Sequence, residues 1–434
     1  MSHASFVYLD DGISGHYSRT DASAASIIQK NDLCLSGFTS NEEKCHWAPM
    51  QIGEWLGMII NTVKFQFQIP PRKIEKVKKS IECALTLKHV SYRELAKIAG
   101  FINSLYLAVG PPVRLFSRQL FFTISQRDSW SGYLDYPPPL LIKELRIWLA
   151  NLSSLSGYNI RPKVYMEPLT IHTDASGIGY GGYSASLRDL NIHGHWSAVQ
   201  SDKSSTFREL LAILLVLKSC VKQIQHKKVK IFSDSQSACR IVQVGSRIPE
   251  LQNIATDIFK ICFTNDIMME TQWIPREENQ IADFLSKTVD LDDWKLNPLL
   301  FDMLHKTWGP FTVERFAAIY NTQLSRFNSR FWCPETEAVD AFTQNWAHEM
   351  NWVCPPVSLV LPVLRHMSVC KAKGTLIVPS WPSAIFWPAI KPGPGRFAPF
   401  VEDSMVLPKV AQMLIPGPGQ LIAYKSKPSV FTGT

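Results

Sequence analysis

The sequence lacks the features of a membrane or secreted protein. It contains no apolar run approaching the roughly 20 residues of a transmembrane helix, and its nine cysteines include no CxxC pair, which argues against a disulfide framework and a zinc site. The opening MSHASFVYLDDGIS carries acids where a signal peptide would be hydrophobic. We therefore expect an intracellular protein of the cytoplasm or nucleus, with no membrane partner.

The chain is long enough for several domains and carries excess positive charge. Its 434 residues exceed one ordinary core, so we expect two or three domains. The formal net charge is +8, and residues 64–118 hold eleven Lys or Arg against three Glu. This basic segment favours a polyanionic partner such as nucleic acid, with an ordinary solvated surface as the alternative.

Four acidic residues stand where strands are expected to end or helices to begin. They are Asp174 in IHTDASGIGYGG, Glu209 in STFRELLAIL, Asp234 in KIFSDSQSA and Asp283 in EENQIADFLSK. Two Mg²⁺ ions about 4 Å apart repel each other unless clustered carboxylates neutralise them. Such a cluster would therefore suit metal-assisted cleavage of a phosphodiester.

Each acid also has a structural alternative. Glu209 could complete a capping box with Thr206, and Asp174 could hold a strand end through Ser176. Asp234 could cap the helix that follows it, and the fourth acid could be an exposed helical residue. The presence of all four in one region favours the metal-site hypothesis.

The sequence around these acids predicts an α/β sheet over residues 166–290. Strands are expected in TIHTDASGIGYGGYSASL, HGHWS and KVKIFSDS, and helices over 206–223 and SQSACRIVQ. Four glycines are expected to allow close backbone approach, namely Gly177, Gly179, Gly181 and Gly182. The β-β-β-α-β-α order predicts a mixed sheet with flanking helices.

The N-terminal segment, residues 1–70, predicts two hairpins. FVYLDDGISG indicates a strand, a tight turn at Asp10-Asp11-Gly12 and a returning strand. A second hairpin is expected around Trp55 and Gly57 in EWLGMII.

Residues 71–165 are predicted to be helical. A helix is expected to begin at Pro70-Pro71, because proline is tolerated in the first helical turn. Its inward face comprises Ile74, Val77, Ile81 and Leu85. Its lysines, Lys73, Lys76 and Lys79, lie largely on other faces.

The sequence predicts a second helix in this segment from a capping pattern at its N-terminus. Ser91-x-x-Glu94 predicts a capping box, and the helix is expected to run to about Gly110. Its inward residues are Leu95, Ile98, Ile102 and Leu105. Two helices with lysine-rich outer surfaces suit sequence-independent contact with a phosphate backbone.

The final segment, residues 291–434, is rich in tryptophan and proline. Stretches such as NWVCPPVSLVLPVLR and GTLIVPSWPSAIFWPAI alternate apolar strands with helical sequence. They predict a separate small α/β unit.

The order of these features resembles the reverse transcriptase–RNase H polyprotein of a retrotransposon, closest to the DIRS type. The resemblance covers nearly the whole chain and includes the Tyr8-Leu9-Asp10-Asp11 box, the WLG hairpin, the basic helices and the four acids. It implies a partial palm with primer-grip hairpin in residues 1–70, thumb and connection helices in 71–165, and an RNase H-like domain in 166–290.

The resemblance also implies roles for particular residues. The implied catalytic residues and metal ligands are Asp174, Glu209, Asp234 and Asp283, with Asp10 and Asp11 in a polymerase metal centre. The implied cofactor is a pair of Mg²⁺ ions, or Mn²⁺, and the RNA strand of an RNA–DNA hybrid is the implied substrate. Nucleic-acid contacts are expected at Lys73, Lys76, Lys79, Trp55 and Gly57.

Two departures from the family limit these roles. The family's polymerases need an earlier Asp and a fingers region, which this sequence does not contain, so polymerase activity is not expected. Cellular RNase H enzymes usually carry a His before the fourth acid, where QWIPREENQ has none.

The tail has a resemblance of its own. Residues 351–357, NWVCPPV, with Arg315-Phe316-Ala317 upstream, resemble the methyltransferase-like domain of DIRS-type elements. An amino-methyltransferase uses Asp or Asn before Pro-Pro and an aromatic residue after it. Because Cys354 and Val357 occupy those places, we expect a structural or nucleic-acid-binding remnant.

Two functional hypotheses follow. The first is a metal-dependent RNase H attached to an incomplete reverse transcriptase, with other proteins of the element as possible partners. The second is a non-catalytic nucleic-acid-binding remnant of such a polyprotein. An unselected remnant that barely folds is a third reading, which cooperative unfolding of a soluble product would exclude.

Overall fold

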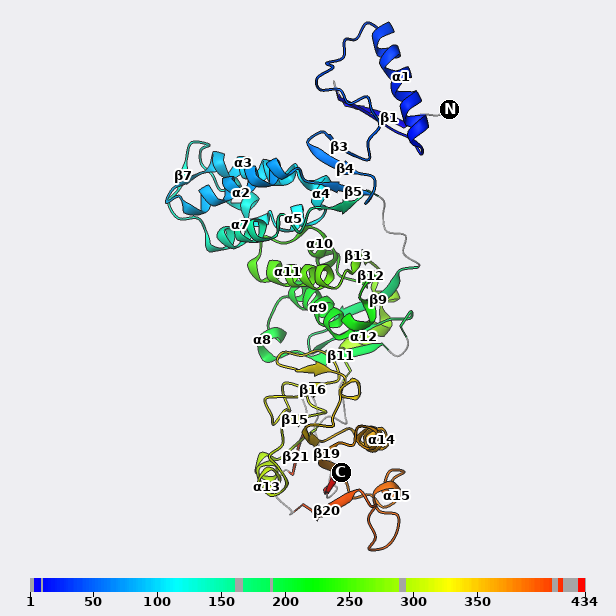
Figure 1. Cartoon of the computed structure of the whole chain (residues 1–434). Helices are drawn as coiled ribbons and strands as arrows, with labels where there is room; N and C mark the ends of the chain where they lie inside the picture. Colours follow the sequence, from blue (N-terminus) through cyan, green and yellow to red (C-terminus); the bar gives the residue numbers. More distant parts are fainter. Residues whose placement is uncertain are drawn as a thin grey trace. The chain divides into compact units, whose positions relative to one another are not determined.

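The chain folds into two compact units. The computed structural model describes residues 4–8, 11–160, 167–187, 190–288, 294–407, 413–416 and 428–433. The first unit comprises Met1–Met166 and Gln243–Thr256, and the second comprises Glu167–Val242 and Asp257–Thr434 (Figure 1). Among the described residues, no helix is both long and apolar enough to span a membrane. The four-domain division expected from the sequence stays a prediction.

The first unit opens with a hairpin whose turn differs from the predicted one. Strand β1 (Ala4–Tyr8) pairs antiparallel with β2 (Asp11–Gly15), and α1 (Arg19–Leu35) follows. Tyr8 lies opposite Asp11, so Asp11 and Gly12 already belong to the returning strand. The turn predicted at Asp10-Asp11-Gly12 is therefore wrong by about one residue, and Asp10 lies outside the described residues.

The second predicted hairpin is present. Strand β3 (Ile52–Trp55) pairs with β4 (Met58–Asn61), and Trp55 lies opposite Met58. The two linking residues, Leu56 and Gly57, have φ values of 49° and 71°. Two-residue turns with left-handed backbone match the twist of the flanking strands, which explains the glycine. Two short strands complete this sheet, β5 (Gln66–Gln68) and β8 (Tyr158–Asn159).

The helical part of the first unit begins where the prolines predict. Helix α2 (Pro71–Thr86) has proline at its start and buries Val77 and Ile81. Helix α3 (Tyr92–Asn103) carries the predicted capping box between Ser91 and Glu94. The remaining elements are β6 (Val90–Ser91), α4 (Tyr106–Val109), α5 (Pro112–Leu115), α6 (Arg118–Ser125), β7 (Tyr133–Leu134) and α7 (Pro139–Asn151).

The second predicted helix is shorter than expected. It ends at Asn103, and α4 begins three residues later at Tyr106. The apolar residues predicted to face inward, Leu95, Ile98, Ile102 and Leu105, are all buried. The apolar spacing therefore identified the buried face correctly but did not reveal the break at Ser104.

A buried carboxylate fastens two of these helices together. Glu144 of α7 accepts hydrogen bonds from the backbone N–H groups of Gln119 and Leu120, at 2.9 and 2.8 Å. These N–H groups belong to the first turn of α6, whose donors lack partners within the helix. Burial raises the pKa of Glu144 to about 7, although these bonds favour its charged form.

The second unit contains the predicted mixed sheet, in the order β11-β10-β9-β12-β13. Its strands are β9 (Leu169–Ala175), β10 (Gly179–Tyr183), β11 (Asn191–His195), β12 (Lys228–Ser233) and β13 (Met268–Trp273). Strand β9 runs antiparallel to β10 and parallel to β12, which is in turn parallel to β13. The α/β fold class with a mixed sheet is thus confirmed.

Helices flank this sheet (Figure 1). The helices of this region are α8 (Ala198–Ser201), α9 (Ser205–Ile224), α10 (Gln236–Val244), α11 (Pro249–Thr264), the 3₁₀ turn η1 (Arg276–Glu278) and α12 (Gln280–Ser286). The end of α10 and the first half of α11, within Gln243–Thr256, belong to the first unit. Helix α9 buries an apolar run from Leu210 to Leu217, as expected of a helix enclosed on most sides. Its N-terminus is capped by Ser204, whose hydroxyl accepts from the N–H of Phe207 at 3.2 Å.

Two glycines of β10 let helices approach both faces of the sheet. A Cβ on Gly181 would lie 2.4 Å from the carbonyl oxygen of Ala282 in α12, and one on Gly182 would lie 2.6 Å from Val216 in α9. Successive strand residues point to opposite faces. Helices α12 and α9 therefore cover opposite faces, and α12 has its present position because Gly181 has no side chain. By contrast, Gly177 has open space around it, so close approach there was wrongly predicted.

The C-terminal part of the second unit contains both strands and helices, as predicted, and its separation as a domain stays a prediction. Its sheet has the order β15-β18-β19-β22-β20. The strands are β15 (Val313–Glu314), β18 (Met350–Val353), β19 (Lys373–Pro379), β20 (Val401–Val406) and β22 (Pro428–Gly433). The other elements are α13 (Pro298–Trp308), α14 (Val360–Cys370), α15 (Trp387–Ile390), η2 (Ala341–Thr343), η3 (Val357–Leu359) and the strand pairs β14 (Trp294–Leu296) with β21 (Leu414–Pro416) and β16 (Asn328–Ser329) with β17 (Ala338–Val339).

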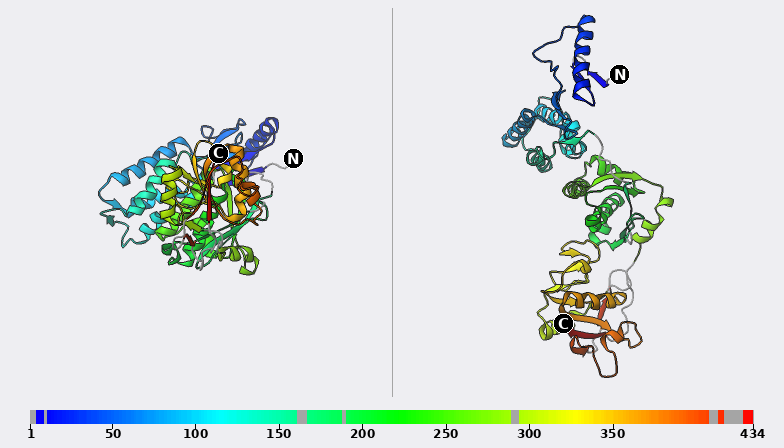
Figure 2. Two further views of the ribbon diagram at one scale, coloured as in Figure 1. Left: turned by 90° about the horizontal axis from the view of Figure 1, so that it is seen from below. Right: turned by 45° about the vertical axis from the view of Figure 1, so that its right-hand side comes forward.

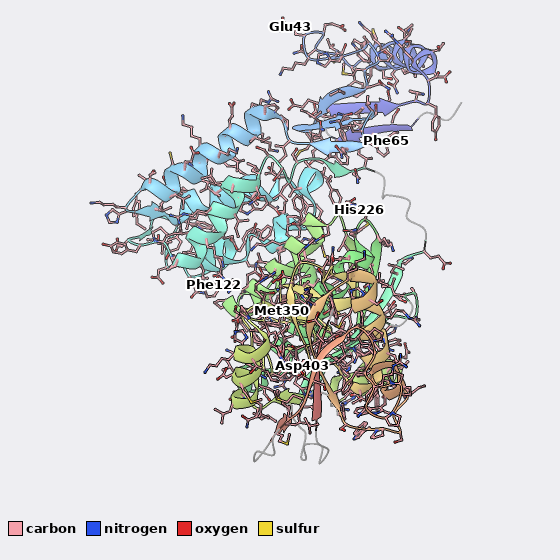
Figure 3. The ribbon with its side chains drawn as sticks, turned by 60° about the horizontal axis from the view of Figure 1, so that its bottom comes forward. Glu43, Phe65, Phe122, His226, Met350 and Asp403 are labelled. Atoms are coloured by element: carbon pink, nitrogen blue, oxygen red, sulfur yellow. The ribbon has the colours of Figure 1, made fainter. Side chains whose placement is uncertain are left out.

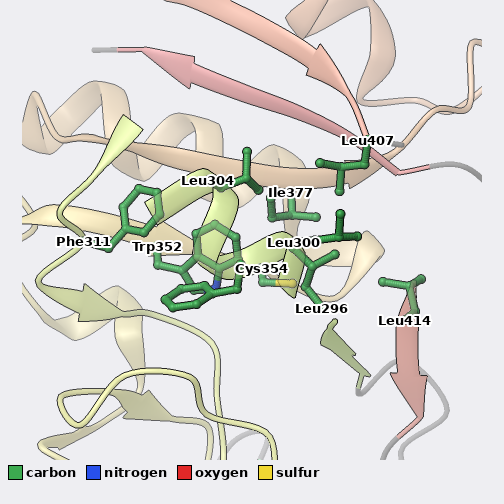
Figure 4. Close-up of a cluster of buried hydrophobic side chains, with 10 residues drawn as sticks. Leu296, Leu300, Leu304, Phe311, Trp352, Cys354, Ile377, Leu407 and Leu414 are labelled. Carbon is green, nitrogen blue, oxygen red and sulfur yellow. The ribbon is translucent and has the colours of Figure 1, made fainter. Parts of the chain in front are cut away.

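Two apolar clusters hold this part together. In the first, Trp352 packs edge-on against Phe301 of α13, with ring centroids 4.9 Å apart (Figure 4). In the second, Val360 and Val363 of α14 pack with Leu376 and Val378 of β19. Figure 2 shows the ribbon of this part from two further sides. At the β20 edge of the sheet, Trp308 Nε1 donates to the carboxylate of Asp403 at 3.1 Å. Asp403 is labelled in Figure 3.

Replacing Gly181 with Ala tests how closely α12 approaches the sheet. The new methyl group would overlap backbone atoms of α12, so we expect a loss of about 1–3 kcal/mol of unfolding free energy. Gly177→Ala is the matched control, because nothing lies within 4 Å of its Cβ position. Urea denaturation of both variants measures the difference, and equal stability would contradict the close approach.

Candidate metal centre

Two of the predicted acids come from neighbouring parallel strands. Thr173 of β9 lies opposite Ser233 of β12, so Asp174 and Asp234 follow at equivalent positions. Carboxyl ends of adjacent parallel strands meet at one edge of a sheet, which is where polar residues gather. The backbone of Asp234 is fixed there, because its carbonyl accepts from Trp273 Nε1 at 3.0 Å.

The third acid reaches this edge from a helix. Glu209 lies in α9, and the backbone of Ala175 at the end of β9 is near enough to its carboxyl to favour the charged form and so to lower its pKa. One carboxylate oxygen each from Asp174, Glu209 and Asp234 lies within 4.8 Å of the others. The structure therefore brings together three of the four acids selected from the sequence.

The three carboxylates are poorly solvated and repel one another. Asp174 is 4% exposed and Glu209 is 9% exposed. Burial first, and then the charges of Asp174 and Asp234, raise the pKa of Glu209 to about 9. The pKa values of Asp174 and Asp234 are also raised, chiefly by burial. Among the described residues, the buried Oε2 of Glu209 has no hydrogen-bond partner.

The capping alternatives for two acids are wrong. Ser204 caps α9, so Glu209 is not part of a capping box. At the start of α10, the hydroxyl of Ser235 accepts from the N–H of Ala238 at 3.2 Å and takes the role considered for Asp234. Simple capping therefore does not explain why these carboxylates converge.

Helix α12 is fastened to the strand that carries the first acid. Asn279 is fully buried, and its Nδ2 donates to the carbonyl of Thr173 at 2.9 Å. The hydroxyl of Ser176 donates to the carbonyl of Ser286 at 2.6 Å, so the structure does not give it the role of fixing Asp174. These contacts hold the N-terminal end and the last residue of α12 against the region of β9.

The fourth acid differs from the other three. Oδ1 of Asp283 lies 2.7 Å from Nη2 of Arg276, and Oδ2 lies 2.5 Å from Nζ of Lys287. Hydrogen bonding to Lys287 and Arg276 lowers its pKa below the usual value. Asp283 is near enough for its charge to raise the pKa of Asp174, but it is outside the group of three.

The two basic partners were missed from the sequence, although one left a signal. Lys287 follows Asp283 by four residues, a spacing that places side chains next to each other on a helix. Arg276 lies in η1, which precedes α12, and only the folded loop brings it to the carboxylate.

The residues present fit a divalent metal. Carboxylate oxygens are the ligands that Mg²⁺ and Mn²⁺ prefer. A dication would also supply the buried Glu209 oxygen with a partner and offset the repulsion that raises the three pKa values. Asp174, Glu209 and Asp234 are the residues that could hold it.

The acids expected in a second metal centre lie in the first unit. Asp11 is exposed at the start of β2, and Asp10 lies outside the described residues. The structure describes no cluster of three metal-ligating side chains around Asp11. Its role in a polymerase centre stays a prediction.

The residues expected to contact nucleic acid also lie in the first unit. Gly57 is close to Lys73, because a Cβ on Gly57 would lie 3.8 Å from Nζ. Lys73 is half-buried, and burial lowers its pKa. Nζ of Lys76 lies 4.8 Å from the ring centroid of Phe101. Lys79 is exposed on the same helix, and Trp55 is half-buried.

Residues of the expected methyltransferase-like motif have packing roles. Cys354 is 8% exposed and belongs to the cluster around Trp352. Val357 packs against the second cluster, at the start of η3. Arg315 is 4% exposed, and its guanidinium donates to the side-chain oxygens of Asn351 and Asn328, both at 2.7 Å.

Comparison with known families agrees with this site. Residues 175–289 match the family model described as reverse transcriptase-like. The matched segment includes Glu209, Asp234 and Asp283. Asp174 lies one residue before it. No curated protein matches the chain.

Solved structures show remote likeness. The foamy viral protease–reverse transcriptase in complex with double-stranded DNA is 15% identical, with a TM-score of 0.31 over 62% of this chain and 46% of that one. The chain thus spans about half the length of that protein. RNase H1 from Halobacterium salinarum NRC-1 is 15% identical, with a TM-score of 0.24 over 27% of this chain and 94% of that one. LC11-RNase H1 in complex with an RNA/DNA hybrid is 20% identical, with a TM-score of 0.24 over 27% and 92%.

The pKa of Glu209 predicts a pH dependence of stability without metal. A folded-state pKa raised from 4.5 to about 9 means that the folded protein binds this proton more tightly than the unfolded chain. The stabilisation is complete below pH 4.5 and is lost as the pH rises through about 9. We therefore expect Glu209→Gln to stabilise the metal-free protein at alkaline pH and to flatten its pH profile.

Thermal unfolding in EDTA across this pH range measures the effect. Glu278→Gln, which alters an exposed glutamate of the same region, is the control. A Glu209→Gln profile parallel to that of the unaltered protein would contradict a buried, strained carboxylate at this position.

Proposed function

We propose that this protein is a ribonuclease H that hydrolyses the RNA strand of RNA–DNA hybrids with divalent metal ions. The observation that carries the proposal is the convergence of Asp174, Glu209 and Asp234 within 4.8 Å. The segment that matches the reverse transcriptase-like family model contains Glu209 and Asp234, and Asp174 lies one residue before it, which supports the proposal. Asp283 would complete the catalytic set from α12.

The carboxylates would act by binding and orienting. Asp174 and Asp234, on adjacent strand ends, would fix the position of a dication, and Glu209 would hold it from the helix side. When bound, such ions activate water and stabilise the 3′-oxygen that leaves. Burial of Asp174 and Glu209 strengthens these interactions, because a poorly solvated charge is weakly screened.

The basic helical surface would bind the nucleic-acid backbone. Exposed Lys76 and Lys79 of α2 offer charges that attract phosphates without reading sequence. Lys73 lies beside the turn at Gly57, so the hairpin and the helix present one surface. We assign Trp55 to the same surface because it ends β3, next to that turn.

The order of motifs further supports an origin in a retrotransposon polyprotein of the DIRS type. In this view residues 1–165 are the end of a reverse transcriptase that does not polymerise alone, and Asp10 and Asp11 belong to its incomplete metal centre. The second candidate function is a non-catalytic nucleic-acid-binding protein, in which the basic surface persists without cleavage.

Asp174→Asn tests the catalytic proposal. The substitution removes a charge that would bind metal but keeps the side chain's size, so cleavage of a labelled RNA–DNA hybrid in Mg²⁺ should fall by about 100-fold or more. Even outer contacts of a metal site are worth roughly 10- to 100-fold. Asp302→Asn, an exposed aspartate of α13, should leave the rate unchanged.

The same assay separates the two candidate functions. Cleavage confined to the RNA strand and abolished by EDTA supports the nuclease. Binding of the hybrid without cleavage in either Mg²⁺ or Mn²⁺, by protein that unfolds cooperatively, would contradict it and favour the binding function.

Lys76→Gln with Lys79→Gln tests the basic surface. Each lysine lost from phosphate contact should lower the slope of log affinity against log salt by about 1, and affinity should fall for all hybrid sequences alike. Fluorescence anisotropy at several salt concentrations measures both effects. Lys306→Gln with Lys391→Gln removes the same charge from the C-terminal part and serves as the control. An unchanged slope in the α2 variant would exclude this surface.

A further inference from the structure

We propose that Arg276 and Lys287 are internal counterions for Asp283, and that nucleic acid releases this carboxylate for metal binding by drawing Arg276 onto a phosphate. The inference rests on the proposed nuclease function and concerns the regulation of the same site. It explains why Asp283 forms two salt bridges, whereas Asp174, Glu209 and Asp234 form none with the residues that the structure describes.

The contrast lies in how each carboxylate is neutralised. Both oxygens of Asp283 are engaged, one by Arg276 at 2.7 Å and one by Lys287 at 2.5 Å. The buried Oε2 of Glu209 has no hydrogen-bond partner among the described residues. The cluster of Asp174, Glu209 and Asp234 is thus ready for a dication, whereas a dication at Asp283 must compete with two cations.

The two basic side chains are exposed enough to break their ion pairs with Asp283. The side chains of Arg276 and Lys287 are 68% and 48% exposed, whereas that of Asp283 is 22% exposed. Solvent-facing ion pairs are weak, each worth a factor of roughly two to five in an equilibrium constant. The two ion pairs therefore neutralise Asp283 but are weak enough to be broken when another partner binds.

Arg276 could also bind a phosphate of the substrate in place of the Asp283 carboxylate. Its positive charge interacts with Asp174 and Asp234 as well as Asp283, so it lies at the edge of the whole cluster. A guanidinium binds two oxygens of a phosphate in the same forked geometry that it uses for a carboxylate. A phosphate brought to the cluster would therefore offer Arg276 an alternative partner, and a dication at Asp283 would repel Arg276 toward it.

This exchange couples metal and nucleic acid. Without nucleic acid, one dication should bind more tightly than a second, because only the second needs Asp283. If the hybrid removes Arg276 from Asp283, it strengthens the second metal, and by linkage that metal strengthens hybrid binding by the same factor. Metal would then assemble fully only on the substrate.

Mn²⁺ binding to the full chain, followed by electron paramagnetic resonance of the free ion, tests the proposal without relying on cleavage. The unaltered protein should bind one Mn²⁺ tightly and a second more weakly. Arg276→Gln should strengthen the second site roughly twofold to fivefold and the first site by less, because Arg276 pairs directly with Asp283 and only interacts at longer range with Asp174 and Asp234. Arg276→Lys, which keeps the charge, should behave like the unaltered protein in this measurement.

Lys227→Gln is the charge-matched control. Lys227 precedes β12, whereas Asp234 follows the other end of that strand, so this change removes one positive charge far from the cluster. It should leave both Mn²⁺ affinities unchanged. Circular dichroism of every variant establishes that the fold is retained.

A second arm adds an RNA–DNA hybrid whose RNA strand is 2′-O-methylated to prevent cleavage. The hybrid should strengthen the second Mn²⁺ site of the unaltered protein but not that of Arg276→Gln, in which the competitor is already absent. Equal Mn²⁺ affinities in the unaltered protein and Arg276→Gln would overturn this inference and leave the nuclease proposal standing. No Mn²⁺ binding at all would overturn both.

Discussion

Repulsion within a cluster of three carboxylates, two of them buried, is the constraint on which the second unit depends. Asp174, Glu209 and Asp234 approach within 4.8 Å, and their pKa values are raised chiefly by burial and further by neighbouring carboxylates, including that of Asp283. A fold driven only by stability would separate such groups, because uncompensated charge in a poorly solvated place is costly. Their convergence is held by backbone structure, because two parallel strands end side by side and α9 brings Glu209 to the same edge. A bound dication would relieve this repulsion, so the same feature that costs stability suits the site to a metal ion.

The rest of this domain supplies the geometry that the cluster requires. The absence of a side chain at Gly181 lets α12 lie directly on β10, and buried Asn279 ties its N-terminal end to β9. This brings Asp283 toward the other acids while Arg276 and Lys287 balance its charge. Packing and electrostatics therefore act together. Close packing of α9 and α12 against the glycines of β10 fixes where the acidic side chains lie. Arg276 and Lys287 offset part of the negative charge that gathers there.

Much of this could be predicted from the sequence because the signals are local. Asp174 and Asp234 each end an apolar strand, and the capping box at Ser91 marks a helix start, so short patterns were enough. The break at Ser104 could not be predicted, because the apolar spacing continues through it to Leu105 and only tertiary packing separates α3 from α4.

Prediction of the acidic site from the sequence was also incomplete. The sequence indicates four acids of equal standing, but the structure separates Asp283 from the others. That separation depends on the conformation of the η1 loop, which carries Arg276 to the carboxylate across seven residues. Contacts of this kind depend on how a loop folds against a helix, and neither composition nor periodicity records them. The roles expected of Asp10 and Asp11 rest on motif order alone.

The most direct measurement of the central claim is anomalous X-ray diffraction from crystals of the full chain grown with Mn²⁺. The account predicts an anomalous peak coordinated by carboxylate oxygens of Asp174, Glu209 and Asp234, with a second, weaker peak near Asp283 that strengthens when a hybrid is bound. A well-diffracting crystal at saturating Mn²⁺ with no peak among the three carboxylates would contradict the assignment of a metal centre and, with it, the proposed nuclease.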